Sequence, residues 1–161
     1  RVGNWQILML DSQLPGEVGG HLGGGELARL ESALESAEAA GLYTLVCLHH
    51  QPVPVGCSWL DEQMVSDAAE IFAILHRFPR VRGVLWGHVH QELDQVCEEL
   101  RLLCSPSTCV QFLPGQTDFA VDALAPGYRW LELSPAGVIR TGVSRAEAHS
   151  FYVDREAGGY L

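Results

Sequence analysis

Short, mostly apolar runs recur along the first ninety residues, separated by two segments of 32 residues each. The runs are Trp5 to Leu10, Tyr43 to Leu48 and Val81 to Trp86. Their length and their content of strand-forming residues predict buried strands. A glycine-rich stretch, Gly16 to Gly25, follows the first run and is expected to form a loop.

The first intervening segment carries apolar residues at helical spacing. The stripe consists of Leu27, Leu30, Leu34 and Ala37. Glutamates lie outside it, at Glu31, Glu35 and Glu38. This pattern predicts an amphipathic helix, and Gly41 is a typical residue just beyond the end of one.

The second intervening segment follows a proline-rich loop and carries a similar stripe. Its members are Ile71, Ile74, Leu75 and Phe78. Asp67 and Glu70 resemble a capping arrangement at the start of a helix, and Pro79 is expected to end it. Strand, helix, strand, helix, strand is the order of an α/β sheet with crossover helices, in which ligands bind beyond the C-terminal ends of the strands.

From Arg101 onward the pattern changes to short strand-like pieces. These are Leu102 to Cys104, Val110 to Leu113, Tyr128 to Leu133 and Val138 to Val143. The turn residues Pro135-Ala136-Gly137 join the last two pieces into an antiparallel hairpin, which we expect at the edge of the sheet. The residues from 149 to 161 are expected to form a poorly anchored tail.

Composition indicates one domain, because 161 residues with 47% hydrophobic residues can form a substantial core. A formal net charge of -10 argues against a nucleic-acid partner, whose phosphates require clustered Lys and Arg. No apolar run reaches the length of a membrane span, so we expect no membrane association. The first residue is Arg1 rather than Met, which suggests a piece of a longer protein.

The five cysteines contain no CxxC pair, and their odd number fits poorly with a disulfide framework. We therefore expect a reducing cytoplasm. Cys47 falls within an apolar run and is interpreted as a small buried residue. A zinc-thiolate cluster is the alternative.

Histidines follow two of the predicted strands directly: His49 and His50 after the second, His88 and His90 after the third. Neutral imidazole is a common ligand of transition metals. In an extended segment His88 and His90 would project to one side, with His49 approaching from the neighbouring strand. Alone, either histidine motif is more typical of a hydrogen-bonded loop, but the two together indicate a site for two metal ions.

These motifs, His49-His50-Gln51-Pro52 and Gly87-His88-Val89-His90, resemble the last two signature blocks of the calcineurin-like metallophosphoesterases. Further segments resemble the bacterial class III 3',5'-cyclic AMP phosphodiesterases. They are Leu10-Asp11-Ser12-Gln13, Gly56-Cys57-Ser58-Trp59-Leu60-Asp61, Gln91-Glu92-Leu93-Asp94 and the segment from Ser105 to Phe112. The resemblance covers nearly the whole chain.

The resemblance implies a four-layer αββα sandwich with two divalent metal ions, iron with manganese or a similar ion. It implies that His49 and His88 bind one metal and His90 the other. His90 is also expected to contact the substrate. His50 is expected to contact a substrate oxygen, to orient His49 or to make a simple loop hydrogen bond. The implied reaction is two-metal hydrolysis of 3',5'-cyclic AMP to 5'-AMP, with a small cyclic nucleotide as partner.

The family's other ligand blocks, of the types Asp-x-His, Gly-Asp and Gly-Asn-His, do not occur in this sequence. We therefore expect residues 1–148 to be the C-terminal half of a metallophosphoesterase domain that is inactive alone. One alternative is a phosphoesterase acting on other nucleotides. Another is a non-catalytic fragment that forms a homodimer or larger homo-oligomer over its uncovered strands.

Several other residues have side chains capable of chemistry but are interpreted as structural. They are His21, His76, His149, Ser107, Thr108, Trp59 and Phe112. The first three are expected to be surface side chains, with His76 in the last turn of a helix. Ser107 and Thr108 follow Pro106 and are expected in a turn, and the two aromatic residues are expected to pack in the core rather than stack on a purine.

Overall fold

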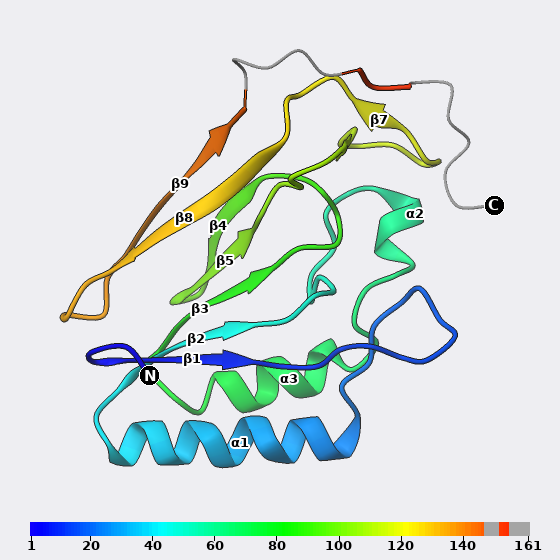
Figure 1. Cartoon of the computed structure of the whole chain (residues 1–161). Coiled ribbons are helices and arrows are strands. Elements are labelled where there is room, and N and C mark those ends of the chain that lie inside the picture. The colour runs from blue at the N-terminus through cyan, green and yellow to red at the C-terminus, as the bar shows by residue number, and fades with distance from the viewer. Residues whose placement is uncertain (147–151, 155–161) are drawn as a thin grey trace.

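The computed structural model describes residues 1–146 and 152–154. Its main sheet has five strands (Figure 1). The strand order is β1-β2-β3-β5-β4. The bounds are β1 (Trp5–Met9), β2 (Tyr43–Cys47), β3 (Val81–Trp86), β4 (Leu93–Cys97) and β5 (Leu100–Cys104). Only β4 runs antiparallel to its neighbour, so the sheet is mixed.

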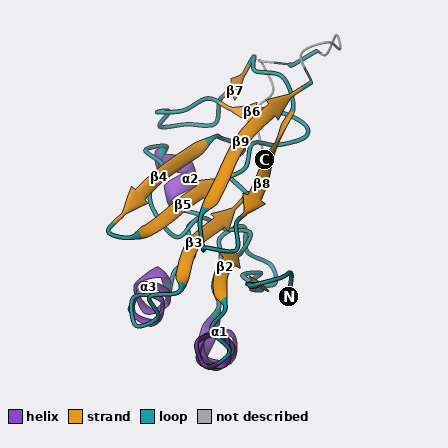
Figure 2. Ribbon diagram, turned by 90° about the vertical axis from the view of Figure 1, so that its left-hand side faces the viewer, coloured by secondary structure: helices purple, strands orange, loops and turns teal. Residues whose placement is uncertain are grey.

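Two helices cover one face of this sheet: α1 (Gly23–Ala39) and α3 (Ala68–Leu75) (Figures 1 and 2). The helices bury the predicted stripes, including Leu30, Leu34, Ile71 and Leu75, which are at most 2% exposed. They pack against the residues of the sheet that face them, such as Val46 and Val84. The crossover helices predicted from the apolar spacing are confirmed.

The opposite face of the sheet is covered by the C-terminal hairpin of β8 (Gly127–Leu133) and β9 (Ile139–Arg145). Its contacts form a second apolar cluster, which joins Trp5, Leu45, Cys47 and Leu103 of the main sheet to Ile139. The hairpin itself is confirmed, but its expected position at the edge was wrong. It forms a separate two-stranded sheet. Strand β2 carries apolar residues on both of its faces, so the main sheet needs cover on the side opposite the helices as well.

Three short elements were not predicted: α2 (Ser58–Asp61), β4 and β7 (Val121–Asp122). The strand predicted from Val110 to Leu113 shortens to β6 (Gln111–Phe112), which pairs with β7. Helix α1 begins at Gly23, inside the stretch expected to be a loop up to Gly25.

Asp67 lies at the expected N-cap position of α3, but the side-chain capping bond expected there was wrong. Its carboxylate makes no cap bond in α3. It accepts instead from the backbone N–H groups of Leu22 (3.0 Å) and Gly23 (2.8 Å) at the start of α1. Free N–H groups at a helix N-terminus attract any nearby carboxylate, and the fold brings this one from another element.

The predicted tail of residues 149–161, with His149, lies outside the described residues except for 152–154. In the described part of the chain, no helix combines the length and the apolar character needed to cross a membrane. All five cysteines are described, and all are free thiols. Burial raises the pKa of Cys47 to about 11, which fits its interpretation as a small buried residue.

Candidate metal centre

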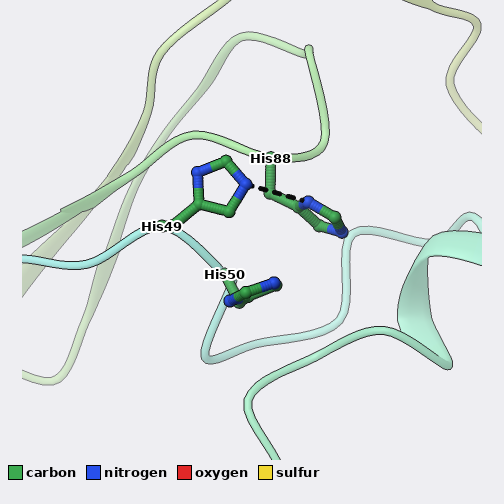
Figure 3. Close-up of side chains that lie close together, drawn as sticks. All are labelled: His49, His50 and His88. Atoms are coloured by element: carbon green, nitrogen blue, oxygen red, sulfur yellow. Dashed lines mark hydrogen bonds between the residues drawn. The ribbon is translucent and has the colours of Figure 1, made fainter. Parts of the chain in front are cut away.

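The two histidine motifs meet at the C-terminal edge of the sheet, because they follow parallel, adjacent strands. Backbone bonds continue the pairing of β2 and β3 past the strand ends: Leu48 donates to Leu85 O (3.1 Å) and Gly87 donates to His49 O (3.2 Å). The side chains of His49, His50 and His88 gather beyond this edge (Figure 3). One ring nitrogen from each lies within 4.8 Å of the others.

The closest pair of ring nitrogens joins the two strands. His49 Nε2 lies 3.2 Å from His88 Nδ1. Facing nitrogens at this distance share a proton in a hydrogen bond, since two lone pairs would repel each other. The same two nitrogens could act as ligands of a cation through their lone pairs.

His50 differs from the other two because its ring nitrogens hydrogen-bond to groups other than histidines. Its Nε2 lies 3.0 Å from the backbone oxygen of Val18, which can only accept, so Nε2 carries the proton. Its Nδ1 then accepts from the Ser12 hydroxyl at 2.8 Å. The loop hydrogen bonding considered for His50 is therefore present.

His88 has a second partner, Gln63, just after α2. The Gln63 Oε1 atom lies 2.8 Å from His88 Nε2. No sequence pattern indicates this contact, because Gln63 lies in a loop 25 residues away. Gln51, beside His50, is fully buried and donates to Leu60 O (2.6 Å). This bond connects α2 to the loop that follows β2.

His90 lies outside this group. Its ring stacks on Phe112, with centroids 4.3 Å apart and planes 9° apart. Its Nδ1 is buried and has no hydrogen-bond partner. A buried polar atom of this kind requires an explanation, such as an absent ligand.

The expectation that the backbone is extended at His88 and His90 was wrong. His88 and His90 have φ angles of 57° and 49°, in the left-handed region. Residues other than glycine adopt this region at a cost of about 1 to 3 kcal/mol each, and such residues concentrate at functional sites. The turn directs the two rings differently, with His88 facing His49 and His90 facing Phe112.

The four histidines of the two motifs, at positions 49, 50, 88 and 90, have lowered pKa values, and burial is the largest cause in each case. The pKa of His88 falls to about 4, because burial is reinforced by repulsion from His50, His49 and His90. The pKa of His50 is also lowered by His49. The imidazoles are thus neutral at pH 7, and neutral imidazole is the form that binds metals.

These features fit a divalent metal ion. The site offers two facing neutral nitrogens, on His49 and His88, and an unpaired buried nitrogen on His90. Imidazole is a suitable donor for iron, zinc and similar ions. Among the described residues, His49, His50 and His88 form the one group of three or more potential metal-binding side chains.

The remaining candidates have ordinary structural surroundings. His21 is partly exposed and lies 3.0 Å from the Ser66 hydroxyl, and His76 follows α3 and lies 3.4 Å from a Glu98 oxygen. The Ser107 hydroxyl accepts from Cys109 N–H (3.0 Å) in the expected turn. Trp59 and Phe112 pack edge to face with Phe119, as expected for core aromatic residues.

Curated relatives match almost all of this chain, although no protein-family model matches it. The chain is 47% identical over 159 residues to the 3',5'-cyclic adenosine monophosphate phosphodiesterase CpdA of Pseudomonas aeruginosa. It is 46% identical over 156 residues to CpdA of Escherichia coli K12. The chain is a homologue of the CpdA proteins.

The similarity covers 99% and 97% of this chain but only 58% and 56% of those two CpdA proteins. The chain thus spans a little more than half the length of these relatives. A 3',5'-cyclic-nucleotide phosphodiesterase of Nostoc is 37% identical over 143 residues, covering 89% of this chain and 53% of that protein.

Solved structures match the fold of this CpdA homologue. A dimetal phosphatase from Danio rerio has a TM-score of 0.51 and 14% identity, covering 70% of this chain and 35% of that one. The Plasmodium protein GAP50, an anchor in the inner membrane complex, has a TM-score of 0.66 and 16% identity, covering 94% of this chain and 48% of that one. The α/β fold of this chain is therefore similar to the folds of these two structures.

Proposed function

We propose that residues 1–148 form the C-terminal part of a metallophosphoesterase domain that hydrolyses 3',5'-cyclic AMP to 5'-AMP with two divalent metal ions. The observation that carries this proposal is the 47% identity to Pseudomonas aeruginosa CpdA across 99% of the chain. The facing nitrogens of His49 and His88 support it at the level of the site. We further propose iron and manganese as the metals and the cytoplasm as the location.

In this proposal His49 and His88 bind one ion, and His90 binds the other through its unpaired ring nitrogen. His50 and His90 are the proposed substrate contacts. For His50, contact through Nε2 requires its bond to Val18 to open. When bound, the two ions lower the pKa of water and neutralise charge on the phosphate.

The chain's own residues supply neutral nitrogen donors and hold them in place. Three imidazoles are fewer than the ligands that two ions require, and no carboxylate joins the histidine group among the described residues. We therefore expect the 161-residue chain to bind divalent metal weakly and to show negligible turnover.

The test compares two purified proteins: the 161-residue chain and a protein of the relatives' length that contains it. Each is assayed with Mn²⁺ and 3',5'-cyclic AMP, then with cyclic GMP, 5'-AMP and a dinucleotide. We expect cyclic AMP hydrolysis by the longer protein only. In it, His49→Ala and His88→Ala should each lower kcat/KM at least 100-fold, while His76→Ala, remote from the site, should leave it unchanged.

Hydrolysis of cyclic AMP by the 161-residue chain would contradict its proposed inactivity. If the longer protein acted on nucleotide monoesters and not on cyclic AMP, the alternative phosphoesterase would replace the present proposal.

A second candidate role, assembly of copies of the chain, is favoured by the exposed Tyr128 and Trp130 on the outer side of β8.

A further inference from the structure

Gln63 and His49 contact opposite nitrogens of the same imidazole. The Gln63 Oε1 atom lies 2.8 Å from His88 Nε2, and His49 Nε2 lies 3.2 Å from His88 Nδ1. A neutral imidazole has one N–H donor and one lone pair. The group that occupies one nitrogen therefore decides what the other nitrogen can do.

An amide oxygen only accepts hydrogen bonds, so its contact with Nε2 requires the proton of His88 to be there. The lone pair of His88 then lies on Nδ1, the nitrogen that faces His49. Without a metal, His49 Nε2–H donates to this lone pair. Binding of a cation between the two requires a change of tautomer at His49 alone, because His88 already has the form that binds.

The backbone around Gln63 is anchored to the loop after β2 that carries His49 and His50. Gln63 N–H donates to Leu60 O (2.9 Å), and Leu60 O also accepts from the buried Gln51 amide (2.6 Å). Two residues after Gln63, Val65 N–H donates to Gln51 O (3.1 Å). These bonds fix the loop, so Gln63 reaches His88 from a constrained backbone.

We infer that Gln63 is a positioning residue that holds His88 in its Nε2–H tautomer and directs the Nδ1 lone pair toward the proposed metal site. The metal-binding part of this inference rests on the proposed function. Partners of this kind, beyond the metal ligands themselves, commonly change metal affinity 10- to 100-fold. The inference assigns Gln63 no contact with metal or substrate.

The test uses the complete 161-residue chain without metal, labelled with ¹⁵N on histidine. Long-range ¹H–¹⁵N spectra at pH 7.5 report which ring nitrogen of His88 carries the proton. We expect the Nε2–H form in the wild type. Gln63→Met, similar in length and unable to accept strongly, should shift His88 toward a mixture of tautomers, and Gln63→Glu, which retains the acceptor, should restore the Nε2–H form.

Zn²⁺ titration, followed by the same ring signals, gives the Kd of each variant. We expect Gln63→Met to raise the Kd about 10-fold and Gln63→Glu to stay within about threefold of the wild type. Gln95→Met is the matched control, since Gln95 is exposed on β4, and it should change neither the tautomer nor the Kd.

An Nδ1–H tautomer in the wild type would overturn the inference, because the Gln63 amide would then donate to Nε2. An unchanged tautomer and Kd in Gln63→Met would also overturn it. If Gln63→Met fails to fold, the wild-type and Gln63→Glu spectra still decide. The tautomer needs no metal or turnover, so failure of the longer protein to hydrolyse cyclic AMP would contradict only the proposed function.

Discussion

The ring of His50 lies directly against the backbone of Gly20. A Cβ atom at position 20 would lie 2.6 Å from His50 Cγ and 2.7 Å from its Nδ1, closer than van der Waals contact permits. The neighbouring bonds from Ser12 and to Val18 hold the ring in the same place. Because His50 packs 4.8 Å from His49 and 4.7 Å from His88, centroid to centroid, its position constrains both proposed ligands.

Gly20→Ala should therefore displace His50 and weaken the site. We expect a loss of about 2 kcal/mol in the free energy of unfolding, as for other overpacked positions, and a higher Kd for Zn²⁺. Gly24→Ala is the control, because a Cβ there meets nothing within 4 Å. It should leave the chain at least as stable. Urea unfolding checks both variants, and equal stability of Gly20→Ala and the wild type would contradict the clash.

Residue type indicated the four histidines, because metal-binding chemistry is restricted to a few side chains, and the apolar runs before them indicated their strands. Their individual surroundings could not be predicted. The partners of His88 and His50 come from loops, Gln63 and Val18, whose approach depends on tertiary contacts. Asp67 was misassigned for the same reason: its helix was correctly located, but its carboxylate serves a different helix.

At the scale of elements, apolar periodicity found the buried strands and helices but missed β4. Four of its five residues are exposed, so it has no apolar run. It is defined by pairing with β5, through a turn in which Glu98 has a φ of 55°. An ion pair crosses the two strands: Arg101 donates from Nε and from a terminal nitrogen to the two Asp94 oxygens, at 2.8 and 2.7 Å.

The hydrogen bond from Arg101 lowers the pKa of Asp94, so this pair should stabilise the hairpin only while the carboxylate is charged. The stabilisation is fully present above the unfolded pKa, about 4. It is lost as the pH falls through the lower folded pKa. Asp94→Asn should cost about 1 kcal/mol at pH 7, since the pair is partly exposed and screened, and much less at pH 2.5.

Urea unfolding of the wild type and Asp94→Asn at both pH values measures this difference. Glu132→Gln serves as the control, because its pair with Arg140 spans 3.7 Å and both side chains are more than 60% exposed. The control should lose less than about 0.5 kcal/mol at pH 7. A difference between Asp94→Asn and the wild type that persists at pH 2.5 would show that charge is not the cause.

For the whole molecule, the sequence resemblance implied layers of helices and two sheets, and the described part of the chain contains a helix layer, the main sheet and the two-stranded sheet of β8 and β9. Periodicity alone could not dock the hairpin, because its inner face mixes apolar residues with Arg129. That side chain is 1% exposed. Charged residues are rarely buried in this way, so the position of Arg129 between the sheets could not be predicted from the sequence pattern.

Arg129 joins the two sheets through main-chain acceptors. It donates from Nε to Cys104 O (2.9 Å) and from a terminal nitrogen to Leu93 O (3.0 Å), and it lies 3.8 Å from Asp94. Burial lowers its pKa, whereas Asp94 and Glu92 act to raise it. The guanidinium therefore satisfies carbonyl groups that the hairpin would otherwise bury without partners.

Arg129→Met should retain most of the packing and remove these bonds, at a cost of about 3 kcal/mol. Because the lost bonds connect the hairpin to the sheet, the substitution should speed hydrogen exchange at amides of β8 and β9 more than at amides of β2 and β3. Arg140→Met, on the outer side of the same hairpin with its side chain 73% exposed, should change stability by less than about 0.5 kcal/mol. Hydrogen exchange and urea unfolding measure both effects. Wild-type stability in Arg129→Met would mean that apolar contacts alone, centred on Ile139, hold the two sheets together.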